Sequence, residues 1–284
     1  MPASSSTPAA VVSLVIAMAS FQAGAAIAKQ LIPAIGAPGT TALRLGLSAL
    51  IVCALQRPWR SLPSRSALGV ILIYGLALGT MNFVFYMALR TIPLGIAVAI
   101  EFTGPLAVAL AGSRRRTDFL WIALALVGLL VLLPVAPTER SLDPVGVAFA
   151  LAAGVCWALY IVYGQKAGRA HGASASTWGM LIAATLTVPI GVALTGRSLL
   201  SPAVLPMGLA VAVLSSAFPY TLEMIALRQL STKTFGTMMS LEPAVAALVA
   251  LLFLNERLTL TQSLAIGAVM IASMGTVRGE ATPP

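Results

Sequence analysis

The chain has 284 residues, of which 59% are hydrophobic and 9% are charged, whereas soluble domains carry about 25% charged residues. This composition excludes a soluble globular protein. The net charge of +9 comes from short basic clusters between apolar runs, so nucleic acid is not an expected partner. The 2 cysteines form no C-x-x-C motif and there is 1 histidine, so we expect no disulfide framework, no metal site and no cofactor.

Apolar runs bounded by proline, glycine and charged residues predict ten transmembrane helices. In chain order they cover residues 11–32, 38–56, 67–89, 93–113, 118–136, 143–164, 174–195, 203–227, 232–254 and 260–277. The runs are continuous and about twice as long as a transmembrane β-strand, which excludes a β-barrel. No basic residue precedes the first run, so we interpret it as a retained helix and not as a cleaved signal. The expected fold is an all-α membrane protein.

The basic residues of the short loops predict the orientation of the chain. If the N-terminus is cytoplasmic, 11 of the 17 Lys and Arg residues lie on the cytoplasmic side, 5 lie outside and Arg44 lies within a helix. Cytoplasmic loops of membrane proteins are enriched in Lys and Arg. We therefore expect a multi-pass protein with both termini in the cytoplasm.

The two halves of the sequence resemble each other. Ala88-Leu89-Arg90 recurs as Ala226-Leu227-Arg228, and Pro105 corresponds to Pro243, at one common offset of 138 residues. A constant offset close to half the chain indicates an internal repeat. The ten helices then form two units of five.

The two five-helix units are predicted to cover residues 1–140 and 141–284. Because five is an odd number, the second unit must enter the membrane from the side opposite to the first. Inverted repeats of this kind place a substrate site near the bilayer midplane in many secondary transporters. The sequence contains no G-x-x-x-x-G-K-[ST] motif, so we do not expect ATP to drive transport.

Glu101 is the strongest candidate for a functional residue, because it lies roughly 12 Å into the fourth predicted helix. A charge at that depth costs at least about 2.5–3.5 kcal/mol, so it must face a cavity or a partner. Pro105 cannot donate a hydrogen bond to the Glu101 carbonyl, and Pro243 cannot donate to the Met239 carbonyl of the matching helix. Helices broken at matching positions indicate a binding site. The alternative is a structural carboxylate that is neutralised by Arg44 or by protonation.

Two further charged residues lie within apolar runs. Arg44 either binds a substrate carboxylate through two parallel hydrogen bonds or forms a fixed ion pair with Glu101. Glu223 follows Pro219, which loosens the helix, and we expect it to contact substrate, to bind a proton or to serve packing alone. The alternatives for both residues stay open. Glu242 also lies in an apolar run and directly precedes Pro243, and we expect it either to contact substrate or to serve the break in the helix.

Polar and aromatic side chains complete the candidate site. Asn82 and Tyr86 are four residues apart and project from one helix face, where Asn82 is expected to bind a substrate amino group or a neighbouring helix. Trp157 and Tyr160 share a face of the sixth predicted helix. They either line the substrate cavity or fill space between helices.

We expect three partners: a small zwitterionic substrate, the lipid bilayer and a second copy of the chain. The motif Gly75-x-x-x-Gly79 carries small residues at the spacing that brings helices close together. This spacing allows close packing within the chain or a homodimer.

The C-terminal half carries a family signature. The run from Ser240 (S-L-E-P-A-V-A-A-L) to Thr259 (N-E-R-L-T) resembles the ninth helix of the drug/metabolite transporter superfamily, in its EamA branch of two five-helix units. Residues 92–110 and 217–227 are similar to the inner-membrane threonine and homoserine exporters. In place of the N-E-R-L-T ending, the first half carries S-R-R-R-T-D at residues 113–118.

The resemblance implies a secondary transporter of the bacterial inner membrane, and not an enzyme. It implies export of a small amino acid such as threonine or homoserine by alternating access, coupled to protons or driven by exchange. Glu101 and Glu223 are then the candidates for proton coupling, because each can alternate between a proton and a substrate amino group. The alternatives are a carrier of another metabolite, such as a drug or a nucleotide sugar, and a passive channel.

Overall fold

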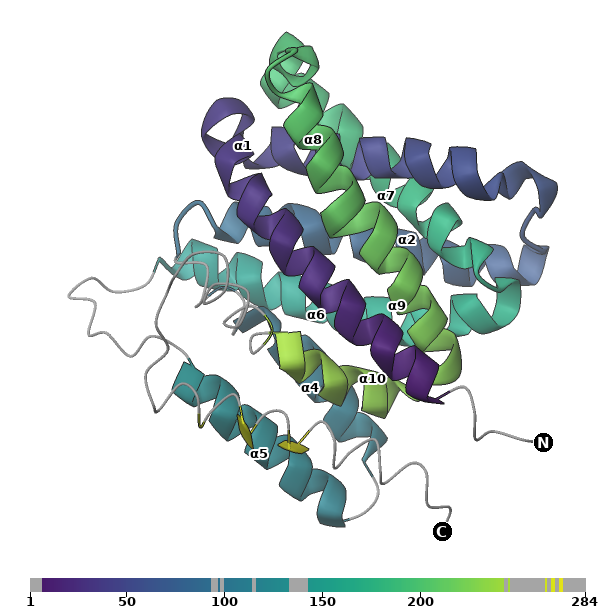
Figure 1. The fold of residues 1–284 in the computed structure, drawn as a ribbon, viewed down its shortest axis with the longest axis vertical. Helices are drawn as coiled ribbons and strands as arrows, with labels where there is room; N and C mark the ends of the chain where they lie inside the picture. Colours follow the sequence, from purple (N-terminus) through teal and green to yellow (C-terminus); the bar gives the residue numbers. More distant parts are fainter. Residues whose placement is uncertain are drawn as a thin grey trace.

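A computed structural model shows the chain as a bundle of α-helices (Figure 1). It describes residues 7–92, 97, 100–113, 116–132, 143–242, 245, 264, 267, 268, 271 and 272, and these contain helices and turns but no strand. Six helical stretches of the described residues are long and apolar enough to cross a membrane: Pro8–Ala25, Leu31–Gln56, Arg65–Ala88, Pro144–His171, Ser174–Leu200 and Leu205–Gln229. The all-α membrane fold is thus confirmed, and the count of ten helices stays a prediction.

The first helix, α1 (Thr7–Gln56), contains the first two predicted spans and bends sharply between them (Figure 1). Gly36 has a φ of 69° in the left-handed region, which glycine adopts without steric cost. Pro33 and Pro38 flank it, and each removes a backbone donor from the helix. The connection predicted between residues 32 and 38 is this bend.

Three long helices form the centre of the bundle. They are α2 (Arg65–Ala88), α6 (Pro144–His171) and α7 (Ser174–Thr195). Helix α2 packs against both α6 and α7, and α1 packs against α7. Short 3₁₀ turns lie at Pro58–Arg60, before α2, and at Gly196–Leu200, after α7.

The eighth predicted span is a helix with a widened turn in its middle. It consists of α8 (Leu205–Ala212), a π-helical turn over Val213–Ala217 and α9 (Phe218–Gln229). In the π turn the N–H of Phe218 bonds to the carbonyl of Val213, five residues back. The next residue, Pro219, has no N–H to donate. Turns of this kind occur frequently at functional sites.

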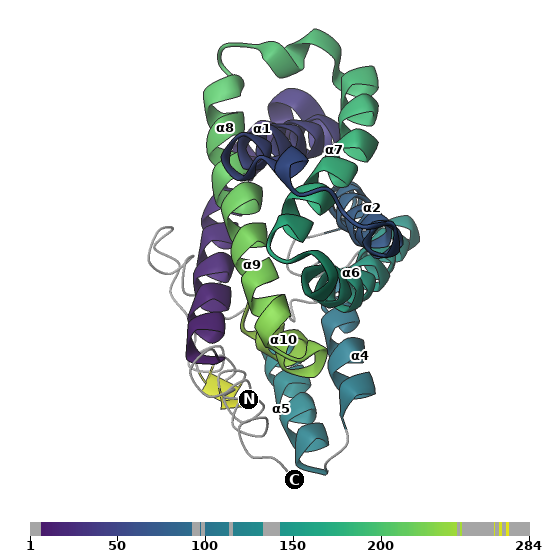
Figure 2. The ribbon, with the colours of Figure 1, turned by 90° about the vertical axis from the view of Figure 1, so that its right-hand side faces the viewer.

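The remaining described helices are shorter and lie together at one end of the molecule in both views (Figures 1 and 2). They are α4 (Thr103–Gly112), α5 (Arg116–Leu132) and α10 (Thr232–Met238), which a 3₁₀ turn over Met239–Leu241 follows. Helix α4 packs against α10 and α6. Pro243 and most of the last two predicted spans lie outside the described residues.

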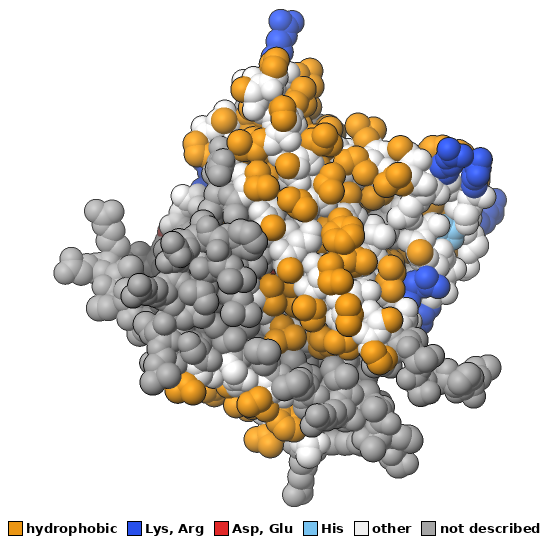
Figure 3. Space-filling model, in the orientation of Figure 1, with side chains coloured by type: hydrophobic (Ala, Val, Ile, Leu, Met, Phe, Trp, Pro, Cys, Tyr) orange, Lys and Arg blue, Asp and Glu red, His pale blue; other side chains and the backbone are white. Residues whose placement is uncertain are grey.

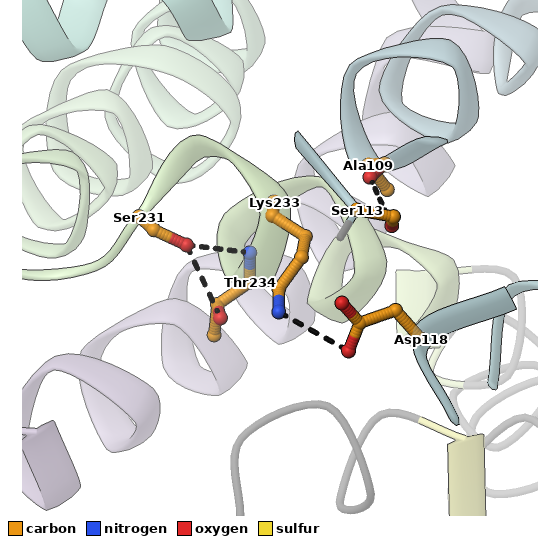
Figure 4. A network of polar contacts seen from close by, with 6 residues as sticks. All are labelled: Ala109, Ser113, Asp118, Ser231, Lys233 and Thr234. Atoms are coloured by element: carbon orange, nitrogen blue, oxygen red, sulfur yellow. Dashed lines mark hydrogen bonds and ion pairs between the residues drawn. The ribbon is translucent and has the colours of Figure 1, made fainter. Parts of the chain in front are cut away.

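A polar network joins the starts of α5 and α10 (Figure 4). The Nζ atom of Lys233 lies 3.3 Å from Oδ1 of Asp118, and both side chains are largely buried. Ser231 caps α10 by accepting a hydrogen bond of 3.1 Å from the Thr234 N–H. This ion pair ties the N-terminal half of the chain to the C-terminal half.

The motif Gly75-x-x-x-Gly79 packs within the chain, against α7. A Cβ atom at Gly75 would lie 2.6 Å from Cβ of Ile182, and one at Gly79 would lie 2.9 Å from Cα of Ala183. Only glycine allows these two helices to approach so closely. The homodimer stays a prediction that needs another contact surface.

We expect Gly79→Ala to destabilise the protein by roughly 1–3 kcal/mol, because the new methyl group would overlap the backbone of α7. Gly69 is the matched control, since it lies on the same helix and a Cβ atom there would have nothing within 4 Å. Gly69→Ala should leave stability unchanged or raise it by about 0.5–1 kcal/mol. Thermal unfolding in detergent measures both changes. Equal effects of the two substitutions would contradict the close α2–α7 contact.

The outer surface of the bundle is apolar. Figure 3 shows apolar side chains over the described part of one face, with Lys and Arg gathered at its edges. The large exposed apolar side chains include Leu50, Leu55, Leu68, Leu120, Leu151, Val155, Leu194 and Leu209. An exterior of this kind suits the hydrocarbon of a bilayer, and charged groups are then confined to the interior or the interfaces.

Candidate substrate site

Arg44 lies in the second part of α1 and is only 6% exposed. Its guanidinium donates three hydrogen bonds: Nε to Oγ of Ser216 at 2.6 Å, Nη1 to the Tyr86 hydroxyl at 3.0 Å and Nη2 to the Tyr220 hydroxyl at 3.4 Å. All three acceptors are neutral hydroxyl groups. Arg44 thus joins α1 to α2 and to the π turn and α9.

Aromatic rings enclose the Arg44 guanidinium. Its Cζ atom lies 5.8 Å from the ring centre of Phe21 and 5.7 Å from that of Tyr86, within cation–π range. Among the described residues no carboxylate forms an ion pair with Arg44. Since a buried charge needs a counter-charge, this arrangement leaves room for an anionic group of a ligand.

The π turn places Ser216 beside Arg44, and two serines of α1 satisfy the carbonyl groups at the turn. Ser20 donates 2.6 Å to the Leu214 carbonyl, and Ser48 donates 2.8 Å to the Ala212 carbonyl. Helix α1 approaches closely here, because a Cβ atom at Gly24 would overlap Ser215. Both parts of α1 therefore hold the turn in position.

Glu223 is buried in α9 and accepts a hydrogen bond of 2.5 Å from the Tyr160 hydroxyl of α6. The Tyr160 ring lies 5.8 Å from the ring of Tyr220. Asn82 donates 2.9 Å to the Tyr220 hydroxyl and 2.8 Å to the Leu78 carbonyl. Tyr220 therefore connects Asn82 and Arg44 and packs beside the Tyr160–Glu223 pair.

Glu101 lies where the fourth predicted span is interrupted. Residue 101 is helical, Phe102 is in a turn, and α4 begins at Thr103. The Glu101 side chain is 8% exposed and therefore buried. Helix α6 crosses closely, since a Cβ atom at Gly154 would lie 2.8 Å from the Glu101 carbonyl oxygen.

Glu242 follows α10 and is the third carboxylate of the interior. Its Oε1 atom accepts a hydrogen bond of 3.5 Å from Gln22 of α1. Its Oε2 atom is buried and has no partner among the described residues. One carboxylate oxygen is therefore available to a ligand.

Four charged side chains, Arg44, Glu101, Glu223 and Glu242, form one electrostatic cluster, separate from the Asp118–Lys233 ion pair. Glu101 interacts with Glu242 and Arg44, and Glu223 also interacts with both. Within the described residues, no group of three His, Cys, Asp or Glu side chains is arranged to hold a metal ion. The cluster contains one guanidinium and three carboxylates.

The structure brings most of the predicted site residues together. Arg44 contacts Tyr86, and Asn82 is linked to Arg44 through the Tyr220 hydroxyl. Tyr160 packs beside Tyr220 and bonds to Glu223. Trp157 instead packs edge-on against Phe102, at a ring distance of 6.3 Å, next to Glu101. Pro105 is buried in α4 and Pro219 starts α9.

Four residues of the cluster are missing from the sequence prediction: Phe21, Gln22, Ser216 and Tyr220. The pair Ser215-Ser216 within an apolar run was a usable signal, as was Tyr220 three residues before Glu223. Phe21 and Gln22 carry no such signal, because their role depends on which helix packs against α1.

Membrane-crossing helices around a buried cluster of charges define a multi-pass membrane protein with an interior polar site. Residues 144–278 match the EamA-like transporter family. The chain is 54% identical over 273 residues to the threonine/homoserine exporter RhtA of Escherichia coli (strain K12), covering 95% of this chain and 92% of that protein. The chain belongs to the EamA-like transporter family, which confirms the predicted resemblance and a transporter rather than an enzyme.

Other relatives agree with this assignment. The threonine/homoserine exporter RhtA of Salmonella typhimurium (strain LT2) is 54% identical over 270 residues, which cover 94% of this chain and 92% of that protein. An uncharacterized transporter of Clostridium kluyveri is 24% identical, over 73% of this chain and 70% of its own. A solved crystal structure shares the fold, with a TM-score of 0.73 at 17% identity, over 95% of this chain and 99% of that chain.

Proposed function

We propose that the chain is a secondary transporter that exports threonine, homoserine or a similar zwitterionic amino acid across the inner membrane. The observation that carries this proposal is the 54% identity, over 95% of the chain, to exporters named for these two substrates. The buried cluster supports it, because a zwitterion needs one cationic and one anionic contact in the same site.

Arg44 and the hydroxyl groups around it suit the substrate carboxylate. The hydroxyls of Ser216, Tyr86 and Tyr220 each accept a hydrogen bond from Arg44. Each hydroxyl also carries one proton of its own, which it can donate to an anion. Hydrogen bonds between charged groups are shorter and about twice as strong as neutral ones.

The carboxylates suit the substrate ammonium group. Oε2 of Glu242 is buried without a hydrogen-bond partner among the described residues, and the Glu101 side chain is buried as well. A charge-assisted hydrogen bond to an ammonium group contributes about 1.5–3 kcal/mol. In this proposal Glu101 binds the substrate amino group, with Glu242 close by. Trp157 packs against Phe102, the residue after Glu101, and lines the site there.

Proton coupling follows from the number of carboxylates. Within the described residues of the cluster, one guanidinium and three carboxylates would leave two unbalanced negative charges if all were ionised. A zwitterionic substrate does not change that balance, so protons must bind with it or replace it. Glu101 and Glu223 each bind a proton and a substrate amino group in turn, which couples export to the proton gradient. In the exchange mode one substrate molecule replaces another, and no net proton movement is needed.

The ten-helix plan of two inverted units, residues 1–140 and 141–284, is part of the proposal. One contact supports it: Asn82 bonds to Tyr220, 138 residues further along the chain, which is also the offset of the sequence repeat. Residues at equivalent positions of two repeats contact each other where the two-fold axis that relates the repeats passes between them. In this plan Pro105, Pro219 and Pro243 are the helix-breaking residues, and both termini face the cytoplasm.

A counterflow assay in proteoliposomes tests the proposed function. Vesicles preloaded with unlabelled threonine should accumulate labelled threonine and homoserine in a saturable manner. Leucine, a nucleotide sugar and a cationic drug serve as competitors from other chemical classes. Accumulation of one of these in place of threonine and homoserine would assign the chain to another metabolite, and uptake that does not saturate would indicate a channel.

A further inference from the structure

Tyr74 of α2 carries a hydroxyl that the site described above does not use. The side chain is 0% exposed, and its hydroxyl is buried without a hydrogen-bond partner among the described residues. A buried hydroxyl without a partner destabilises a protein, and phenylalanine would avoid that cost. The tyrosine at this position therefore needs another explanation.

Two glycines make room for the Tyr74 ring but do not explain its hydroxyl. A Cβ atom at Gly164 of α6 would lie 3.0 Å from Cε2 of the ring, and one at Gly179 of α7 would overlap the opposite edge. Phenylalanine has the same ring and would fill this slot equally well. The packing selects an aromatic residue, and the oxygen is additional.

The Tyr74 ring lies directly beside the pair that holds Glu223. Its centre is 5.2 Å from that of Tyr160, with the two planes inclined by 31°. Tyr160 donates its proton to Oε2 of Glu223 at 2.5 Å. On the far side of Tyr160 lie the Tyr220 ring, at 5.8 Å, and then Arg44.

The line from Glu223 through Tyr160 to Tyr74 leads toward the end of the bundle where α6 ends and α7 begins. Gly164 precedes the last residue of α6, His171, by seven residues, and Gly179 follows the first residue of α7 by five. At 1.5 Å per residue, Tyr74 therefore lies roughly 8–10 Å from that end. The charged or titratable groups near this end include Lys166, Arg169, His171 and Arg228, which packs against Gly168. The proposed orientation makes this end cytoplasmic.

We propose that Tyr74 and Tyr160 form a proton relay between Glu223 and the end of the bundle at the α6–α7 connection. This inference rests on the proposed proton-coupled function. When the bundle opens to that end during alternating access, a hydronium ion gives a proton to the Tyr74 oxygen and becomes water. Tyr74 passes its own proton to Tyr160, through one bridging water molecule, and Tyr160 passes its proton to Glu223.

The relay conserves every hydroxyl group. Each tyrosine gains one proton and loses one, the bridging water does the same, and only the Glu223 carboxylate is converted to a carboxylic acid. Rotation of the two hydroxyls restores the starting arrangement. The reverse sequence releases the proton to the same end.

The substitution Tyr74→Phe tests the relay, because it removes one oxygen and keeps the ring that the glycines accommodate. Transport driven by an imposed pH gradient should slow by about tenfold or more, in line with the loss of one proton-transfer group. Counterflow at equal pH should stay within about twofold of wild type, since it moves no net protons. Tyr163→Phe is the control: Tyr163 lies on α6 near Lys166, outside the line to Glu223, and should change neither rate.

Two outcomes would overturn the relay. An unchanged gradient-driven rate in Tyr74→Phe would show that protons reach Glu223 by another route, and equal losses in both assays would show a structural role. An infrared pH-jump experiment needs no transport substrate. Glu223→Gln should remove the Glu223 component of the carboxyl C=O band and so identify it, and Tyr74→Phe should slow the rise of that component. Absence of threonine counterflow in the wild type would overturn the proposed substrate and leave this infrared test of the relay intact.

Discussion

Arg44→Lys is expected to weaken threonine binding by about 10- to 100-fold, equivalent to about 1.5–3 kcal/mol. The planar guanidinium reaches Ser216, Tyr86 and Tyr220 at once, and a lysine ammonium is a single point charge on a flexible stem. The substitution keeps the positive charge, so the loss measures the geometry of the donors. Equilibrium binding of labelled threonine to purified protein gives the value.

Arg197→Lys is the matched control for this experiment. Arg197 is exposed in the 3₁₀ turn after α7, far from the buried cluster in the chain, and its replacement should leave the affinity unchanged. The Arg44 proposal would be wrong if Arg44→Lys bound threonine as tightly as this control does.

Glu101→Gln is expected to abolish export driven by a pH gradient and to weaken substrate binding by about 1.5–3 kcal/mol. Glutamine keeps the size and hydrogen-bonding capacity of the side chain but fixes it in a neutral state. The protein should insert normally, because a buried charge is removed and not added. Vesicle transport with an imposed pH gradient, alongside binding to purified protein, measures both effects.

Glu223→Gln separates the two candidates for proton coupling. It keeps a hydrogen-bond acceptor for Tyr160, so any loss of gradient-driven transport reports the charge. A wild-type rate in Glu101→Gln combined with a loss in Glu223→Gln would assign coupling to Glu223 and leave Glu101 a structural role.

The positions of the long helices could be predicted from the sequence. The predicted spans 67–89 and 174–195 are observed as Arg65–Ala88 and Ser174–Thr195. Hydropathy locates such helices because each must match the thickness of the bilayer, which is a local property of the chain. Proline and glycine likewise mark the bend of α1 at Gly36.

The site was predictable only in part. A charged residue in an apolar run must be buried with a partner, so Arg44, Glu101 and Glu223 stand out in the sequence. Their partners depend on which helices pack together. The π turn that presents Ser216, the hydroxyl of Tyr220 and the ion pair of Asp118 with Lys233 result from tertiary packing, which periodicity does not encode.

The close approach of α2 and α7 shows the same division between local and tertiary information. The spacing of Gly75 and Gly79 predicts that a helix packs against this face. It does not distinguish α7 of the same chain from a second copy, and the structure identifies α7 as the neighbour.

Binding of paired ligand analogues tests the central claim, that Arg44 holds the substrate carboxylate and Glu101 the ammonium group. Threonine and its methyl ester, which lacks the negative charge, are titrated against wild type, Arg44→Lys and Glu101→Gln. We predict that esterification lowers affinity by about 10- to 100-fold in wild type and in Glu101→Gln, but by less than about threefold in Arg44→Lys. The free-energy effects of changing two groups add when the groups are far apart, and they do not add when the groups contact each other. An equal loss on esterification in all three proteins would contradict the pairing of Arg44 with the carboxylate.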